Sequence, residues 1–187
     1  VLVSGANASS WRGRYHAKAT QKQRVQADLS SELPQLEVQS VSSNDMDDIE
    51  SKVDIKAKGK APAFARKDGE TRSVGLGARE HMVRTYAPLS SRREPLRLHA
   101  LTTEENETVV HLPPGAKVIG APHASNGTTP YGSFKVETEN ANGVVKVKTT
   151  ISLAKSRIPA SEYPAFRAWC ESVDRELGQS VTYSVGK

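Results

Sequence analysis

The single cysteine, Cys170, is the first residue in the sequence that could act as a nucleophile. A reactive thiolate needs a neighbour that lowers its pKa, such as a helix N-terminus, a histidine or another cation. Cys170 instead lies between Phe166 and Val173, in a pattern of apolar residues at steps of three and four that is typical of a buried helix face. We therefore expect Cys170 to pack as a small apolar side chain. The alternative, an independent cysteine hydrolase, requires a histidine within hydrogen-bond reach of this thiol.

The histidines and carboxylates do not follow the spacing of a metal site. No two histidines are four residues apart, and none has the cysteine spacing of a zinc site. The five histidines are His16, His81, His99, His111 and His123. The acidic segment at 44–50 has the composition of a calcium loop, but the EF-hand positions for glycine and glutamate, counted from Asp45, hold Glu50 and Lys56. We expect a solvent-exposed turn at this segment and no bound metal.

Two other catalytic or binding motifs are incomplete. Gly75 and Gly77 lack the third glycine and the Lys-Ser/Thr pair of a phosphate-binding loop, and they are interpreted as strand or bulge glycines. The G-x-S-x-G elbow of serine hydrolases does not occur. The sequence therefore predicts no catalytic, cofactor-binding or metal-binding residue in this chain.

Positive charge is concentrated in the first predicted helix. The whole chain has 26 basic and 21 acidic residues, a net charge of +5. A helix is predicted from Ser9 or Ser10 to Leu33, and its cations could contact phosphate groups. These cations are Arg12, Arg14, Lys18, Lys22 and Arg24. No base-stacking aromatic residues or recognition motif accompany them, so a solvated helix face is favoured and nucleic acid is not an expected partner. Polyanion binding through the helix from Arg12 to Arg24 is kept as the alternative function.

After this helix the sequence is dominated by β patterns. Val53, Ile55 and Ala57 alternate with polar residues, which predicts a half-buried strand. Asn142-Gly143 separates two alternating runs and predicts a type I′ hairpin over residues 134–153. Further strands are expected at 71–76, 82–86, 108–112 and 117–121, and a loop is expected at 126–130.

The end of the chain predicts an amphipathic helix at 161–177 and a final strand at 180–185. The apolar stripe of this helix consists of Tyr163, Phe166, Cys170, Val173 and Leu177. Ser161 is the expected N-cap, and Gly178 is expected to end the helix in a left-handed conformation. Because one face of the predicted β-sheet needs cover, we expect this helix to pack on it.

Together these patterns predict an α+β, mainly β protein. Its core is expected to be an antiparallel β-sandwich, with an N-terminal basic helix and the C-terminal amphipathic helix packed on the sheet. Residues 1–60 form a predicted strand-helix-strand segment, and residues 61–187 a predicted β-domain. No apolar run approaches the length of a membrane span, and the single cysteine excludes an internal disulfide.

Five segments carry a resemblance to a known protein class. They are VSGANASSWRGRY, SSRREPL, HLPPGAKV, PYGSFKVE and RIPASEYPAFRAWCESVDRELGQSV, and they extend from Val3 to Val181. In these segments the chain resembles the C-terminal β-rich region of bacterial transglutaminase-like proteins that carry an N-terminal domain of unknown function.

The resemblance implies a non-catalytic structural or interaction module in a longer protein. In that family a papain-type Cys-His-Asp set, with protease, amidase or acyltransferase chemistry, lies upstream of the matching region. Cys170 does not match the catalytic cysteine, because it belongs to the closing helix and has no histidine after it. The implied partners are an upstream catalytic domain of the same polypeptide and a protein or component of the cell envelope. The implied location is the periplasm or cell envelope, and VLVSG is expected to follow or to end the catalytic domain.

Overall fold

The chain folds as two compact units, Val1–Phe64 (unit 1) and Ala65–Lys187 (unit 2). The structure, a computed structural model, describes residues 1–30, 33, 35–62, 64–76 and 81–185. Gly77, one of the two glycines considered above, lies outside the described residues.

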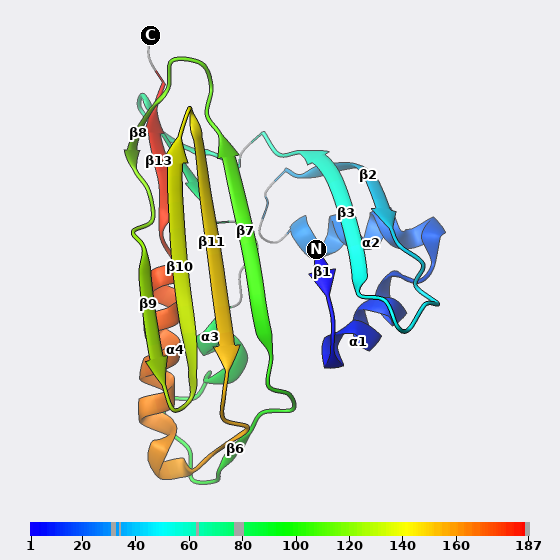
Figure 1. Cartoon of the computed structure of the whole chain (residues 1–187), viewed down its shortest axis with the longest axis vertical. Helices are drawn as coiled ribbons and strands as arrows, with labels where there is room; N and C mark the ends of the chain where they lie inside the picture. The colour runs from blue at the N-terminus through cyan, green and yellow to red at the C-terminus, as the bar shows by residue number, and fades with distance from the viewer. Residues whose placement is uncertain (31–32, 34, 63, 77–80, 186–187) are drawn as a thin grey trace. The chain divides into compact units, whose positions relative to one another are not determined.

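Unit 1 is a three-stranded antiparallel sheet whose one face is covered by two helices (Figure 1). Its elements are β1 (Leu2–Val3), α1 (Ala6–Tyr15), α2 (Lys18–Ser30), β2 (Glu37–Ser43) and β3 (Val53–Lys60). The strand order is β1-β3-β2, so β3 is central. Val53 and Ile55 of β3 are buried and pack with Tyr15 and Val25 of the helices. This cluster is the core of unit 1.

The prediction of a single basic helix in this unit is wrong, because the chain forms two helices separated at residues 16–17. In one continuous helix Tyr15 and Asp28 would be about 20 Å apart, at 1.5 Å per residue. The break turns α2 back along α1, and the Tyr15 hydroxyl donates a hydrogen bond to Asp28. The buried side-chain amide of Gln21 donates to the Tyr15 carbonyl, which satisfies an acceptor at the end of α1. Both apolar stripes can then face the same small sheet.

Unit 2 contains two four-stranded antiparallel sheets, which confirms the predicted mainly β, α+β class. The first has the order β7-β11-β10-β9, with β7 (Thr103–His111), β11 (Val144–Leu153), β10 (Gly132–Ala141) and β9 (Ser125–Thr129). The second has the order β4-β5-β13-β8, with β4 (Arg66–Asp68), β5 (Thr71–Gly75), β13 (Ser180–Ser184) and β8 (Lys117–Gly120). A short pair joins β6 (Leu96–Arg97) to β12 (Arg157–Ile158). Apolar residues from both four-stranded sheets, together with Leu76 after β5, form one buried cluster: Leu76, Val136, Val145, Val147 and Val181.

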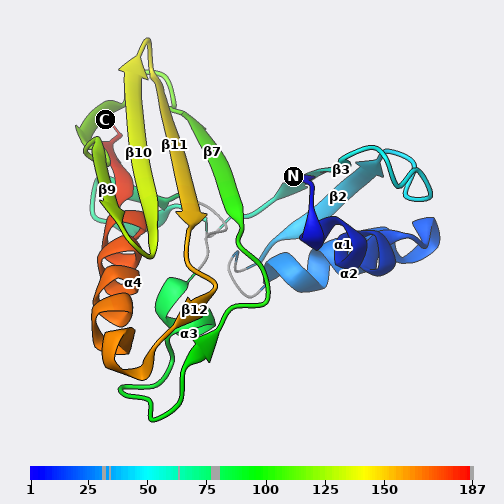
Figure 2. The same cartoon turned by 60° about the horizontal axis from the view of Figure 1, so that its bottom comes forward.

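The helix α4 (Tyr163–Leu177) packs on this assembly as predicted (Figure 2). All five residues of its predicted stripe are buried, and they pack with Ile151 and Leu153 of β11. The helix ends differ from the prediction. The 3₁₀ turn η1 (Ala160–Glu162) precedes α4, and the N-cap is Glu162 without a side-chain capping bond. Gly178 has φ −69°, so the helix ends in a right-handed conformation.

Two elements of unit 2 differ from the predicted type. Residues 82–86 were predicted as a strand but form the helix α3 (Met82–Tyr86). The carboxylate of Asp174 accepts hydrogen bonds from the main-chain nitrogens of Met82 at 2.7 Å and Val83 at 3.0 Å, which caps α3 from a distant helix. The prediction of a loop at 126–130 is also wrong, because this segment pairs with β10 as the strand β9.

Candidate functional site

Cys170 lies in the core of unit 2 and has an exposed fraction of 0%. Its cluster is apolar and aromatic, and it includes Phe166 and Trp169 of the same helix. Burial, and to a smaller extent the nearby Asp174 carboxylate, raise the pKa of the thiol to about 12. The prediction that Cys170 packs in the core is therefore confirmed. A thiol with this pKa carries almost no thiolate at neutral pH, so it is a poor nucleophile.

We expect Cys170 of the folded protein to react with iodoacetamide at pH 8 at least ~1,000-fold more slowly than in the denatured chain. A thiol with a pKa of about 12 has about one thiolate in ten thousand molecules at pH 8. Mass spectrometry of the alkylated protein, with and without denaturant, measures both rates. Fast alkylation of the native protein would contradict the buried position of this side chain.

The same pKa predicts how stability changes with pH. The unfolded thiol ionises near its ordinary value of 9.0 and the folded one near 12, so between these values the unfolded state loses its proton first. The contribution of Cys170 to stability is complete below pH 9 and decreases as the pH rises towards 12. Cys170→Ala should lose this part of the pH dependence while it keeps the rest, as measured by urea denaturation at pH 8 and pH 10.5.

A serine, a histidine and a glutamate meet where the β8–β9 connection reaches the end of α4. Glu176 Oε2 accepts hydrogen bonds from Ser125 Oγ at 3.0 Å and from Gln179 Nε2 at 2.9 Å, and it lies 3.3 Å from His123 Nε2. In a catalytic triad the histidine contacts the serine and removes its proton. Here both side chains contact the carboxylate instead, so the arrangement lacks an activated nucleophile. It fixes the loop before β9 onto α4, and no sequence motif indicated it.

The other histidines do not join a common site. His16 forms an exposed pair with Asp47 at 2.9 Å in unit 1, and His111 lies on β7 in unit 2. Within the described part of the chain, no group of three or more histidine, cysteine, aspartate and glutamate side chains is arranged to hold a metal ion. No described helix is long and apolar enough to cross a membrane.

Four of the five cations in the predicted basic helix bind oxygens of unit 1 itself. Arg12 donates to the main-chain carbonyls of residues 48, 49 and 51, and Lys18 donates to Ser43. Arg14 forms a two-point pair with Asp28, and Arg24 donates to the carbonyl of Arg14. These cations therefore hold the helices and the 44–52 loop together. The polyanion-binding alternative stays a prediction.

A pocket of about 660 Å³ opens between the two helices and the sheet of unit 1. Its wall is mainly apolar and includes the rings of Trp11 and Tyr15, whose centres are 5.3 Å apart. The full lining is Val1, Trp11, Arg14, Tyr15, Val25, Asp28, Leu29, Ile55, Lys56 and Ala57. This size and lining are typical of a binding pocket.

Two polar side chains of this pocket, Asp28 and Tyr15, have shifted pKa values. Hydrogen bonds from the Arg14 guanidinium hold the pKa of Asp28 below its ordinary value, despite some burial. Burial, and then the hydrogen bond to Asp28, raise the pKa of the Tyr15 hydroxyl. An ionised carboxylate and a neutral phenol that bind each other are suited to orient a bound group, but neither is suited to transfer protons near neutral pH.

Comparison with known proteins adds a family and a fold. Residues 78–183, more than half of the chain, match the family model described as "Domain of Unknown Function with solved-structure structure (DUF3858)". The chain belongs to the DUF3858 family. The matched region begins within unit 2 and leaves all of unit 1 outside. No curated protein matches the chain.

One solved structure shares the fold. It is the crystal structure of a protein from Parabacteroides distasonis that is described as a "putative protease", with a TM-score of 0.52 and 17% sequence identity. The likeness covers 64% of the present chain and 24% of that protein. The chain thus spans about a quarter of the length of this relative. An identity this low shows the fold alone.

The DUF3858 region has a charged face on its β7-β11-β10-β9 sheet. Cross-strand ion pairs connect Lys146 to Glu107 at 2.9 Å and Lys148 to Glu105 at 3.4 Å. These side chains are close to half exposed. Such pairs fix strand register more than they add stability, because water screens them. The face is therefore a solvated surface with balanced charge.

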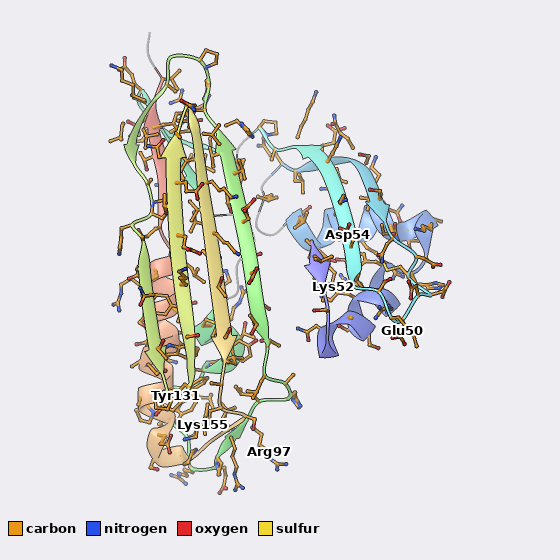
Figure 3. The ribbon with its side chains drawn as sticks, in the orientation of Figure 1. Glu50, Lys52, Asp54, Arg97, Tyr131 and Lys155 are labelled. Carbon is orange, nitrogen blue, oxygen red and sulfur yellow. The ribbon has the colours of Figure 1, made fainter. Side chains whose placement is uncertain are left out.

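At one end of this sheet a lysine and a tyrosine of the DUF3858 region lie together (Figure 3). Lys155 Nζ is 5.8 Å from the centre of the Tyr131 ring and 2.5 Å from a carboxylate oxygen of Glu162. The Tyr131 ring packs edge-on against Phe166 at 5.7 Å. Lys155 therefore interacts with the Glu162 carboxylate and the Tyr131 ring of the same unit. Its contacts connect the end of β11 to the turn before α4.

Proposed function

We propose that this chain acts as a non-catalytic structural or interaction module in the C-terminal region of a transglutaminase-like protein. The observation that carries the proposal is the position of Cys170, the only thiol of the chain, in an apolar core with a raised pKa. A Cys-His-Asp enzyme needs an accessible thiolate paired with a histidine. The reaction would therefore belong to another part of the polypeptide.

Two further points support a role within a longer protein. The chain corresponds to only 24% of the Parabacteroides distasonis protein, which is described as a "putative protease". The segment RIPASEYPAFRAWCESVDRELGQSV resembles the tail of bacterial transglutaminase-like proteins and coincides with β12, α4 and the start of β13. On this proposal the nearest partner is an upstream transglutaminase-like catalytic domain of the same polypeptide, in the periplasm or cell envelope.

The first experiment tests the chain by itself. Purified residues 1–187, incubated with a casein substrate and with a glutamine-donor peptide plus an amine, should give no turnover above that of a heat-denatured sample. Cys170→Ala should behave identically. Turnover by the wild type that is lost in a still-folded Cys170→Ala variant would overturn the proposal.

The second experiment tests the longer protein. The product of the whole gene should show cysteine-dependent activity that survives Cys170→Ala and is lost when a cysteine outside residues 1–187 is replaced. A gene that encodes no Cys-His-Asp domain would overturn the proposed parent. It would leave the conclusion about Cys170 unchanged.

A further inference from the structure

The short strand pair of unit 2, β6 with β12, places two arginines directly opposite each other. In this antiparallel pair Arg97 is the partner of Arg157. The main-chain nitrogen of Leu98 donates a hydrogen bond to the carbonyl of Ser156 at 2.8 Å. That bond flanks the two arginines and makes them a non-hydrogen-bonded pair, the kind in which opposed side chains lie closest. Both guanidinium groups therefore extend from neighbouring positions on one face.

The apolar core fixes this register. Ile158 is the partner of Leu96 in the same strand pair. Ile158 is fully buried in the cluster that includes α4, and Leu96 packs against that cluster. Because successive side chains of a strand point to opposite faces, Arg97 and Arg157 face solvent, and both are exposed. A slip of one residue would turn an arginine into the core, so the two charges are held opposite each other.

No carboxylate of the described residues neutralises these two charges. Neither Arg97 nor Arg157 forms a side-chain hydrogen bond or an ion pair within the described part of the chain. The nearest acidic residues along the two segments are Glu94 and Glu162. Glu162 is paired with Lys155 at 2.5 Å, and Figure 3 labels Lys155 and Arg97 at the same end of unit 2. Like charges directly opposite each other destabilise a strand pair, and a bound anion would remove this repulsion.

The geometry and the charge of the pair define the anion that fits. Each guanidinium presents a planar fork of N–H donors that matches the oxygens of a phosphate or a carboxylate. A phosphomonoester carries a charge between about −1.5 and −2 at neutral pH and has three terminal oxygens, so it can accept from both forks at once. A carboxylate or a phosphodiester carries one negative charge and would leave the second arginine unneutralised.

We propose that Arg97 and Arg157 together bind the phosphomonoester group of a ligand. We call this pair the two-arginine site. A soluble phosphorylated molecule and a lipid headgroup can both supply the same group. The inference goes beyond the proposed function, since it concerns a ligand of unit 2 and holds with or without a catalytic domain.

The first experiment titrates purified residues 1–187 with phenyl phosphate at an ionic strength kept constant with chloride. In ¹⁵N NMR spectra the amides of residues 96–98 and 156–158 and the side-chain Nε–H groups of both arginines should shift and saturate. Acetate and dimethyl phosphate, each with a single charge, should bind at least ~10-fold more weakly. An absence of saturable shifts at these residues, or equal affinity for acetate and phenyl phosphate, would overturn the proposal.

Three variants separate the two-arginine site from general attraction to positive charge. Arg97→Gln and Arg157→Gln should each weaken phenyl phosphate binding by roughly tenfold or more. Arg175→Gln is the matched control, because Arg175 is an exposed arginine about 18 Å along α4 from the end that follows β12. This variant should leave the affinity unchanged. Equal weakening by all three substitutions would indicate general electrostatic attraction and contradict the proposed site.

Stability gives a second readout. Arg157→Glu places an opposite charge beside Arg97, so the repulsion is replaced by an ion pair without a phosphate. Phenyl phosphate should therefore raise the urea midpoint of the wild type and of Arg175→Gln, but not that of Arg157→Glu. An equal rise in Arg157→Glu would show that the anion acts elsewhere on the protein and would decide against the two-arginine site.

The source of the phosphomonoester is tested with vesicles of phosphatidylcholine, with and without phosphatidate. Co-sedimentation that needs phosphatidate, that phenyl phosphate inhibits and that Arg97→Gln abolishes would support the site with a lipid as the source. Binding of phenyl phosphate without co-sedimentation would support the site with a soluble ligand. A protein that binds neither phenyl phosphate nor the phosphatidate vesicles would refute the proposal.

Discussion

Gly132→Ala should lower the free energy of unfolding of unit 2 by about 3 kcal/mol, at the upper end of the usual cost of overpacking. A Cβ atom at this position would lie 2.1 Å from the main-chain oxygen of Ser152 and 2.8 Å from Cη2 of the Trp169 ring. The backbone cannot easily move away, because Gly132 is paired with Leu153 on one side and Thr129 on the other. The added methyl group must therefore displace either the sheet or α4.

Gly120→Ala provides the matched control for this prediction. Gly120 also lies in a strand of unit 2, but a Cβ atom there would have nothing within 4 Å. Its alanine variant should change stability by less than about 1 kcal/mol, and in the stabilising direction if at all. Urea denaturation followed by Trp169 fluorescence, in a Trp11→Phe background, isolates the transition of unit 2. Equal midpoints for the two variants would contradict the close approach of α4 to β10.

Phe166→Ala should destabilise unit 2 by about 3–5 kcal/mol, because it removes a fully buried aromatic ring. The ring packs against Tyr131 at 5.7 Å, Trp169 at 6.0 Å and Tyr163 at 6.5 Å between ring centres. These rings belong to the apolar cluster that joins α4 to Ile151 and Leu153 of β11. The neighbouring strands β10 and β11 are paired along their whole length, so they cannot move fully into the cavity that Phe166→Ala would leave. The loss in the free energy of unfolding should therefore approach about 5 kcal/mol.

The exposed face of the same helix supplies the control. Glu171 pairs with Arg167 at 3.0 Å one turn away, and Glu171→Ala should cost no more than about 0.5 kcal/mol. Phe166→Leu keeps most of the apolar volume, so its loss in the free energy of unfolding should lie between those of Glu171→Ala and Phe166→Ala. Denaturation midpoints at constant m-value give the comparison. A Phe166→Ala variant within 1 kcal/mol of the wild type would show that α4 is not a required cover of the sheet.

Features that depend on neighbouring residues could be predicted from the sequence. Asn142 and Gly143 have φ values of 52° and 74°, as a type I′ turn requires, and they connect β10 to β11 in the predicted hairpin. The period of the α4 stripe correctly predicted that Cys170 is buried, which removed the main candidate for catalysis. Trp169 is buried beside the predicted stripe, because an apolar helix face is wider than a single row of residues.

Other features depend on contacts between residues far apart in the chain, and the tertiary structure alone decided them. Met82 begins a helix because Asp174, 92 residues later, accepts its main-chain hydrogen bond. Residues 125–129 form a strand because β10 offers them a free edge, although their composition is typical of a loop. Glu176 meets Ser125 and His123 by the same kind of long-range packing.

The sheet of unit 1 shows the same division. The alternation of Val53, Ile55 and Ala57 with lysines predicted a half-buried strand, since a period of two is a property of the local sequence. That Trp11 and Tyr15 form the wall of a pocket beside this strand depends on the break between α1 and α2. The local sequence determined the alternation of β3 and the amphipathic face of α4. The tertiary structure determined which faces were covered, because pairing and packing join residues that no local pattern relates.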